Sequence, residues 1–80
     1  MNAEQIEGVV GYLQDLKSES DTSKALREKL DRIINLLNGE SELAADKALI
    51  ALEELNSVDL SSYHRTRVWD IISLLESVKN

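Results

Sequence analysis

The 80-residue sequence contains no cysteine, no proline and only one histidine, His64. Without cysteine the chain can form no disulfide bond, no thiolate zinc site and no cysteine nucleophile. A single histidine cannot build a histidine-rich metal cage. Basic residues are also scarce: nine lysine and arginine residues against 15 acidic residues give a net charge of −6. This negative charge argues against non-specific binding to DNA or RNA.

Long hydrophobic runs are absent as well. The longest, Ala48 to Leu52, has five residues, whereas crossing a bilayer takes roughly 20. The first five residues carry neither the basic nor the apolar region of a secretory signal. We therefore expect a cytoplasmic protein without a membrane span and, at this length, a single domain comprising residues 1–80.

Four segments have apolar residues at the spacing of an amphipathic helix, near residues 3–18, 23–38, 42–56 and 62–78. No stretch alternates with the period of two that is typical of strands. The sequence therefore predicts an all-α protein. The apolar stripes comprise Ile6, Val9, Val10, Leu13 and Leu16; Leu26, Leu30, Ile33, Ile34 and Leu37; Ala45, Ala48, Leu49, Leu52 and Leu55; and Val68, Ile71, Ile72, Leu75 and Val78.

Hydroxyl residues precede three of these segments and predict where the helices begin. Thr22 or Ser23 can cap the second helix, Ser41 the third, and Ser61 or Ser62 opens the fourth. Each side-chain oxygen would accept a hydrogen bond from one of the backbone N–H groups that have no partner within the helix.

Three glycines need an explanation. Gly39 follows Asn38 and is expected to stop the second helix in the left-handed conformation that glycine adopts without penalty. Gly8 and Gly11 lie inside the first helix, where each costs about 1 kcal/mol relative to alanine. Either they allow another helix to approach closely, or the first helix is a weak element. The same face could also hold a second copy of the chain.

A shift of 38 residues superimposes the second helix on the fourth and pairs Ser23 with Ser61 and Arg27 with Arg65. A shift of 39 does the same for the first and third helices. The chain is therefore interpreted as two helical hairpins in tandem. Two such units close more naturally as an up-and-down four-helix bundle than as a solenoid, which usually needs at least three repeats.

The negative charge is unevenly distributed along the chain. Residues 1–20 have a net charge of −3 and residues 39–57 a net charge of −4, whereas the second and fourth segments together are close to neutral. In an up-and-down bundle the two acidic helices would lie diagonally opposite each other. In a two-layer solenoid they would lie side by side.

The fourth segment resembles a known family. The run Arg65-Thr66-Arg67-Val68-Trp69, followed by aliphatic residues, Ser73 and Leu75-Glu76, is similar to the C-terminal helix of uncharacterised protein family 0147, a family of small archaeal proteins. Ala48 to Asn56 and Ala25 to Arg27 look similar to its third and second helices. Family members usually have proline where Ser23 and Ser61 stand. The resemblance implies a four-helix bundle from an archaeal cytoplasm and no known activity.

The start of the fourth helix carries the residue types that dominate binding hot spots: Tyr63, Arg65, Arg67 and Trp69. Arg65 and Trp69 are four residues apart, so the guanidinium can lie over the indole ring. One interpretation is that Trp69 fills the bundle wall and Arg65 shields it. The other is a partner-binding patch, with Arg27 as the equivalent residue on the second helix.

Catalytic and metal-binding chemistry find little support. His64 has no acidic residue at position 60 or 68, and Asp59 is too far back on a helix, so we expect a surface or capping histidine. Glu42, Asp46, Glu53 and Glu54 face away from the apolar stripe and are expected to be a solvated face. The sequence predicts no catalytic residue, no metal and no cofactor.

The leading hypothesis is therefore a small non-enzymatic adaptor that binds a protein partner through the start of the fourth helix. The alternative is an RNA- or ribonucleoprotein-associated factor that uses the seven lysine and arginine residues of the second and fourth helices. The net charge disfavours RNA. Self-association through Gly8 and Gly11 is a further hypothesis.

Overall fold

The structure is a computed structural model of the chain and describes residues 3–39, 43–56 and 60–79. It contains four helices: α1 (Ala3–Ser18), α2 (Lys24–Asn38), α3 (Ala44–Asn56) and α4 (Ser62–Lys79). The described residues form no strand. The helix positions agree with the predicted ones to within two residues, because the apolar spacing and the capping residues both mark helix ends.

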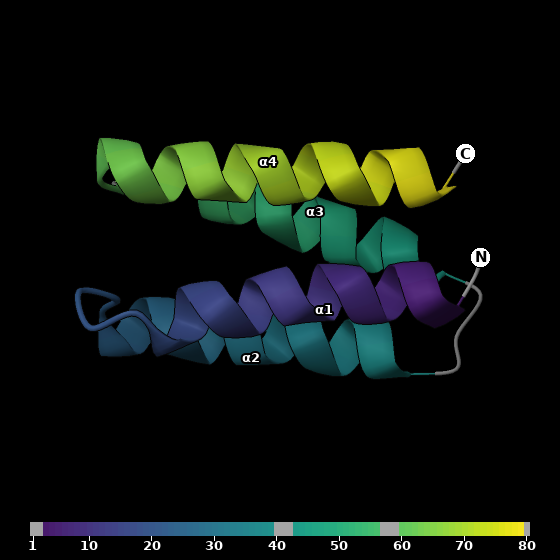
Figure 1. Cartoon of the computed structure of the whole chain (residues 1–80), viewed down its shortest axis with the longest axis horizontal. Coiled ribbons are helices and arrows are strands. Elements are labelled where there is room, and N and C mark those ends of the chain that lie inside the picture. Colours follow the sequence, from purple (N-terminus) through teal and green to yellow (C-terminus); the bar gives the residue numbers. More distant parts are fainter. Residues whose placement is uncertain (1–2, 40–42, 57–59, 80) are drawn as a thin grey trace.

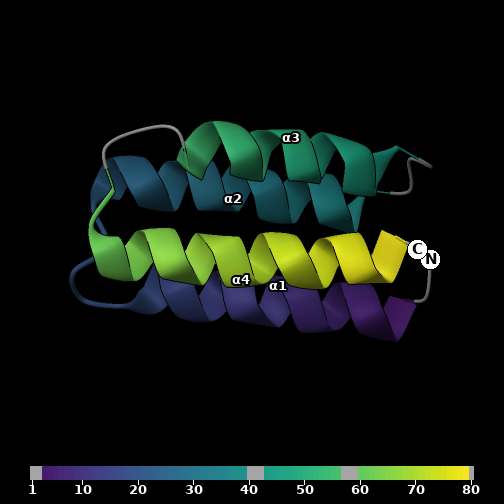
Figure 2. The ribbon, with the colours of Figure 1, turned by 90° about the horizontal axis from the view of Figure 1, so that it is seen from above.

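The helices form an up-and-down bundle about 31 Å long and 16 to 18 Å across. Each helix packs against the helices before and after it in the chain, and α1 packs against α4. Thus α1 lies diagonally opposite α3, and α2 opposite α4, as predicted for a bundle. The start of α1 and the end of α4 lie at one end of the bundle, and the α1–α2 connection and the start of α4 lie at the other (Figures 1 and 2).

The predicted apolar stripes make the core. All four helices contribute, and the side chains of Leu13, Leu30, Leu52 and Leu75 are fully buried. Ile6 and Val78, at the outer ends of their stripes, are only partly buried and pack against the core. Because each helix buries one face, the chain needs only short helices to exclude water from a continuous interior.

Two serines start their helices in the same way. Ser23 Oγ accepts a hydrogen bond from Leu26 N at 3.1 Å, and Ser61 Oγ accepts one from His64 N at 3.1 Å. The chain therefore satisfies, without proline, backbone N–H groups that would otherwise have no partner at both helix starts. The predicted cap Ser41 lies outside the described residues.

The prediction that Gly39 adopts the left-handed conformation was wrong. Gly39 is extended, with φ −73° and ψ 161°, and its N–H donates to Leu36 O at 3.3 Å. Since φ is negative, glycine is not required there by backbone conformation. The α2 terminus is closed by a short i to i−3 hydrogen bond instead.

The interpretation that Gly8 and Gly11 allow another helix to approach closely was also wrong. A Cβ atom added at either position would meet no other atom within 4 Å, since Gly8 is exposed and Gly11 half-buried. Within the described part of the chain these glycines therefore serve no close approach, and they leave α1 with lower intrinsic helix propensity.

Across the described residues, no helix is both long enough and apolar enough to cross a bilayer.

Candidate functional site

The α1–α2 connection is held by hydrogen bonds to the end of α1. Glu19 N donates to Leu16 O at 3.3 Å, and Thr22 N donates to Glu19 O at 3.1 Å. The hydroxyl of Thr22, a residue only 4% exposed, donates to Leu16 O at 2.7 Å. These bonds fix the direction in which Glu19 and its neighbours leave the helix, and they place the connection beside the start of α4.

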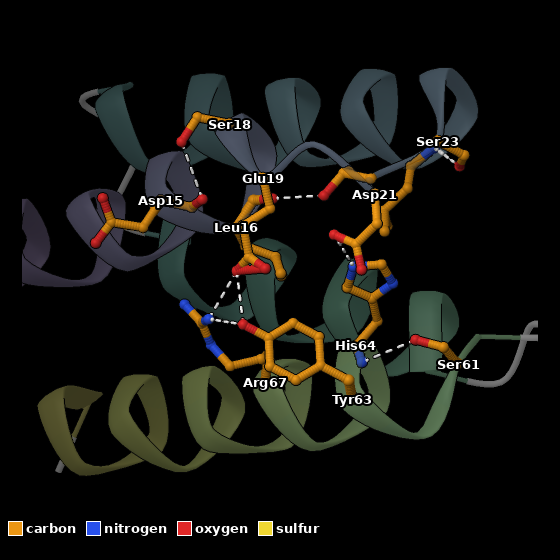
Figure 3. A network of polar contacts seen from close by, with 12 residues as sticks. Asp15, Leu16, Ser18, Glu19, Asp21, Ser23, Ser61, Tyr63, His64 and Arg67 are labelled. Carbon is orange, nitrogen blue, oxygen red and sulfur yellow. Dashed lines mark hydrogen bonds and ion pairs between the residues drawn. The ribbon is translucent and has the colours of Figure 1, made fainter.

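Glu19 is bound by two side chains from α4. Its Oε1 accepts hydrogen bonds from Tyr63 OH at 2.9 Å and from Arg67 Nη1 at 2.7 Å (Figure 3). Arg67 Nη1 also donates to the Tyr63 hydroxyl at 2.7 Å, and its guanidinium lies 5.7 Å from the centre of the Tyr63 ring. Tyr63 and Arg67, predicted as partner-binding residues, thus tie α4 to the α1–α2 connection.

These contacts act on the pKa of Arg67 in opposite directions. Burial lowers it, but the hydrogen bond and charge interactions with Tyr63 and Glu19 outweigh burial, so the pKa rises above its ordinary value. The guanidinium therefore holds its proton more firmly in the folded protein than a free arginine does.

His64 is buried, which corrects the prediction of a surface histidine. Its exposure is 6%, and its Nε2 lies 3.7 Å from Asp21 Oδ1, beyond hydrogen-bonding distance (Figure 3). In the described part of the chain, Nε2 has no hydrogen-bond partner. One ligand atom from each of Glu19, Asp21 and His64 lies within 4.8 Å of the other two. The tertiary structure supplies the acids that His64 lacks on its own helix.

A sequence signal for this burial existed. The 38-residue shift that pairs Ser23 with Ser61 also pairs Leu26 with His64. Leu26 is a core residue, 5% exposed. The histidine therefore stands at a core position of the second hairpin. No local pattern, by contrast, indicates that the acids of the α1–α2 connection lie beside it.

Trp69 and Arg67 lie on different flanks of α4. Two residues apart on a helix, their side chains diverge by roughly 200°. Trp69 is 54% exposed, so it does not fill the bundle wall. Nor does Arg65 cover it: among the described residues, the cation–π contact joins Arg67 to Tyr63 instead. The predicted cluster is therefore two separate surfaces, one towards α1 and one towards α3.

A shallow groove of about 190 Å³ runs between α3 and α4 beside Trp69, and its lining includes Glu53, Asn56 and Ile72. Asn56, the last residue of α3, is 8% exposed. Its Oδ1 is buried and has no hydrogen-bond partner among the described residues. A half-exposed indole thus stands beside an unused hydrogen-bond acceptor.

Arg27 does not join either surface. It is exposed on α2, which lies diagonally opposite α4 in the bundle. Its equivalence to Arg65 is one of position within the hairpin: the backbone N–H of each donates at 2.9 Å to the capping serine's carbonyl oxygen.

The sequence pattern of an uncharacterised protein family, UPF0147, matches residues 1–78. The chain belongs to this family. A UPF0147 protein from Methanosarcina acetivorans is 31% identical over 96% of this chain and 84% of its own length. A second, from Methanosarcina mazei, is 30% identical over 96% of this chain and 87% of its own length. No solved structure gives a significant match.

Membership in UPF0147 confirms the resemblance seen in the fourth helix. Since the family is uncharacterised, membership brings no activity, ligand or partner to this chain.

Proposed function

We propose that this UPF0147 member is a small non-enzymatic adaptor of the cytoplasm that binds a basic segment of a protein partner in the groove between α3 and α4. The observation that carries the proposal is the half-exposed Trp69 beside the buried Oδ1 of Asn56, which has no hydrogen-bond partner in the described part of the chain. The proposal keeps Trp69 from the predicted patch and gives Tyr63 and Arg67 a role in holding the α1–α2 connection to α4. Arg65 is not among the described residues that line the groove.

Trp69 supplies the apolar part of the surface. Tryptophan buries a large area when a partner covers it, and it is among the residues most enriched in binding hot spots. Ile72 lies one turn further along α4 in the same groove. A partner side chain seated there would remove both from water.

Asn56 and Glu53 define the polar chemistry of the partner. A buried amide oxygen without a partner costs about 1 to 3 kcal/mol. A donor from a partner would recover this free energy if the Asn56 side chain turned into the groove on binding. Glu53 is exposed at the groove, and the chain as a whole carries a net charge of −6. Both features favour a segment that presents N–H donors and positive charge.

The RNA-binding alternative has less support. Its cations lie on α2 and α4, which are diagonally opposite, so they do not share one face. Arg67 is already paired with Glu19 at 2.7 Å. Phosphate binding needs a contiguous basic surface, and cations on two diagonally opposite helices argue against one.

The test compares Trp69→Ala with Tyr12→Ala, two aromatic residues with the same 54% exposure. Tyr12 lines the groove between α1 and α4, with Arg67 and Asp70, and serves as the matched control. The wild type and both variants are used to capture partners from native extract, with and without ribonuclease. A protein that is retained is then purified, and its affinity for the wild type and for each variant is measured by calorimetry.

We expect a ribonuclease-resistant protein that binds the wild type and Tyr12→Ala alike. Trp69→Ala should weaken its binding by roughly 30-fold or more, the effect of a hot-spot residue. Equal affinity of the partner for Trp69→Ala and the wild type would refute the proposal that the partner binds in this groove. Loss of the retained material on ribonuclease treatment would favour the RNA alternative.

A further inference from the structure

We propose that Glu19, Asp21 and His64 form a binding site for a divalent transition-metal cation, for which Zn²⁺ is the best match. The site joins the α1–α2 connection to the first turn of α4 (Figure 3). It lies apart from the groove proposed above, so the two proposals stand or fall separately.

The buried imidazole is the observation that points to a ligand. His64 is only 6% exposed, its Nε2 has no hydrogen-bond partner in the described part of the chain, and Figure 3 shows the ring directed towards Asp21. A buried ring nitrogen without a hydrogen-bond partner is unfavourable. Leucine occupies the equivalent position, Leu26, in the first hairpin, so a core position of this kind does not itself require a histidine.

The spacing of the three groups suits a metal ion. Ligand atoms about 2.0 Å from a tetrahedral zinc ion lie about 3.3 Å from one another. His64 Nε2 and Asp21 Oδ1 are 3.7 Å apart, and the three ligand atoms all lie within 4.8 Å of one another. Small movements of two carboxylates would complete the site. Asp21 allows them because its side chain is 66% exposed.

The chemistry of the donors favours zinc over magnesium or calcium. One imidazole nitrogen with two carboxylate oxygens suits borderline transition metals, whereas magnesium and calcium prefer oxygen ligands alone. Three protein ligands leave a fourth tetrahedral position for water. The exposed Asp21 also gives the ion a path from solvent.

The contacts around Glu19 are those expected of a ligating carboxylate. Tyr63 and Arg67 both bind Oε1, so Oε2 keeps its lone pairs for a cation. Hydrogen bonds of this kind orient the carboxylate and reduce the entropy lost on binding the metal. In a small bundle without disulfide bonds, such an ion would fasten the connection to α4.

The experiment titrates ZnCl₂ into the full 80-residue chain, prepared without a polyhistidine tag and freed of metal with EDTA. Calorimetry and thermal unfolding are measured for the wild type, His64→Leu, Asp21→Asn and the control Asp31→Asn. Asp31 has a comparable side-chain exposure of 52%, and it pairs with Lys17 rather than with a residue of the site. His64→Leu copies the residue at the equivalent position of the first hairpin, so it should fold.

We expect the wild type and Asp31→Asn to bind one equivalent of Zn²⁺ and to gain roughly 10 to 20 °C in Tm at a hundredfold excess over Kd. His64→Leu and Asp21→Asn should each lose at least about tenfold in affinity while keeping a helical circular dichroism spectrum. Absence of binding to the wild type, or wild-type affinity in either variant, would overturn the site.

Discussion

Arg67 Nη1 lies 2.7 Å from Glu19 Oε1, and this ion pair joins residues 48 positions apart in the chain. The two side chains are only 26% and 24% exposed. Water screens such a pair less than a fully exposed one. The pair therefore fixes how α4 meets the end of α1, and the first prediction tests it.

Arg67→Met should lower the free energy of unfolding by about 1 to 2 kcal/mol, because it leaves the partly buried Glu19 carboxylate without its cation. A double-mutant cycle with Glu19→Gln, measured by urea denaturation, should give a coupling energy of about 1 kcal/mol. Additive effects of the two substitutions would show that the pair contributes nothing. The pKa of Arg67 is raised in the folded protein. The stabilisation that its positive charge contributes would therefore be lost only as the pH rises through this raised pKa.

Ser23→Ala and Ser61→Ala should each lower the free energy of unfolding by about 1 kcal/mol, because each removes an acceptor 3.1 Å from a backbone N–H group. Asparagine at the same positions should restore most of the loss, since its side chain caps equally well. Urea denaturation of the four variants checks both statements. A loss confined to one serine would show that the two hairpins do not start their second helices equivalently.

Thr22→Val should cost about 1 kcal/mol, because the valine keeps the shape of the buried side chain but removes its hydrogen bond to Leu16 O. Thr66→Val is the matched control: Thr66 is exposed on α4 and the same substitution there should change stability by less than about 0.5 kcal/mol. Thermal unfolding of both variants provides the measurement. Equal effects at the two positions would mean that the Thr22 bond is not a determinant of the connection.

Gly8→Ala and Gly11→Ala should each raise the free energy of unfolding by up to about 1 kcal/mol, because an added Cβ meets no atom at either position and alanine is the better helix former. Amide hydrogen exchange should show greater protection of α1 in the double variant. Destabilisation would contradict this account.

We also predict that any second copy of the chain would bind to the face of α1 that carries Gly8 and Gly11. Light scattering over a range of concentrations tests it: a dimer formed there by the wild type should dissociate more readily in the Gly8→Ala, Gly11→Ala variant. A dimer of unchanged strength would place any self-association elsewhere.

Helical periodicity alone would have shown that the residues of the predicted patch lie on two different sides of the fourth helix. Tyr63, Arg65, Arg67 and Trp69 are close in sequence, but residues two apart on a helix point in nearly opposite directions. Tyr63 and Arg67 contact Glu19, whereas Trp69 lies in the α3–α4 groove. These residues do not share one surface, so grouping them by their distance in the sequence was wrong.

The sequence by itself determined the four helices, their order and the core, because apolar spacing and capping serines act within a few residues. It determined less about helix ends without a capping side chain, such as Gly39, where several backbone conformations can satisfy the terminal carbonyl groups. Only the tertiary structure decided what surrounds His64. Packing α1 against α4 brings Glu19 and Asp21 beside a histidine more than 40 residues away, and no local preference encodes that meeting.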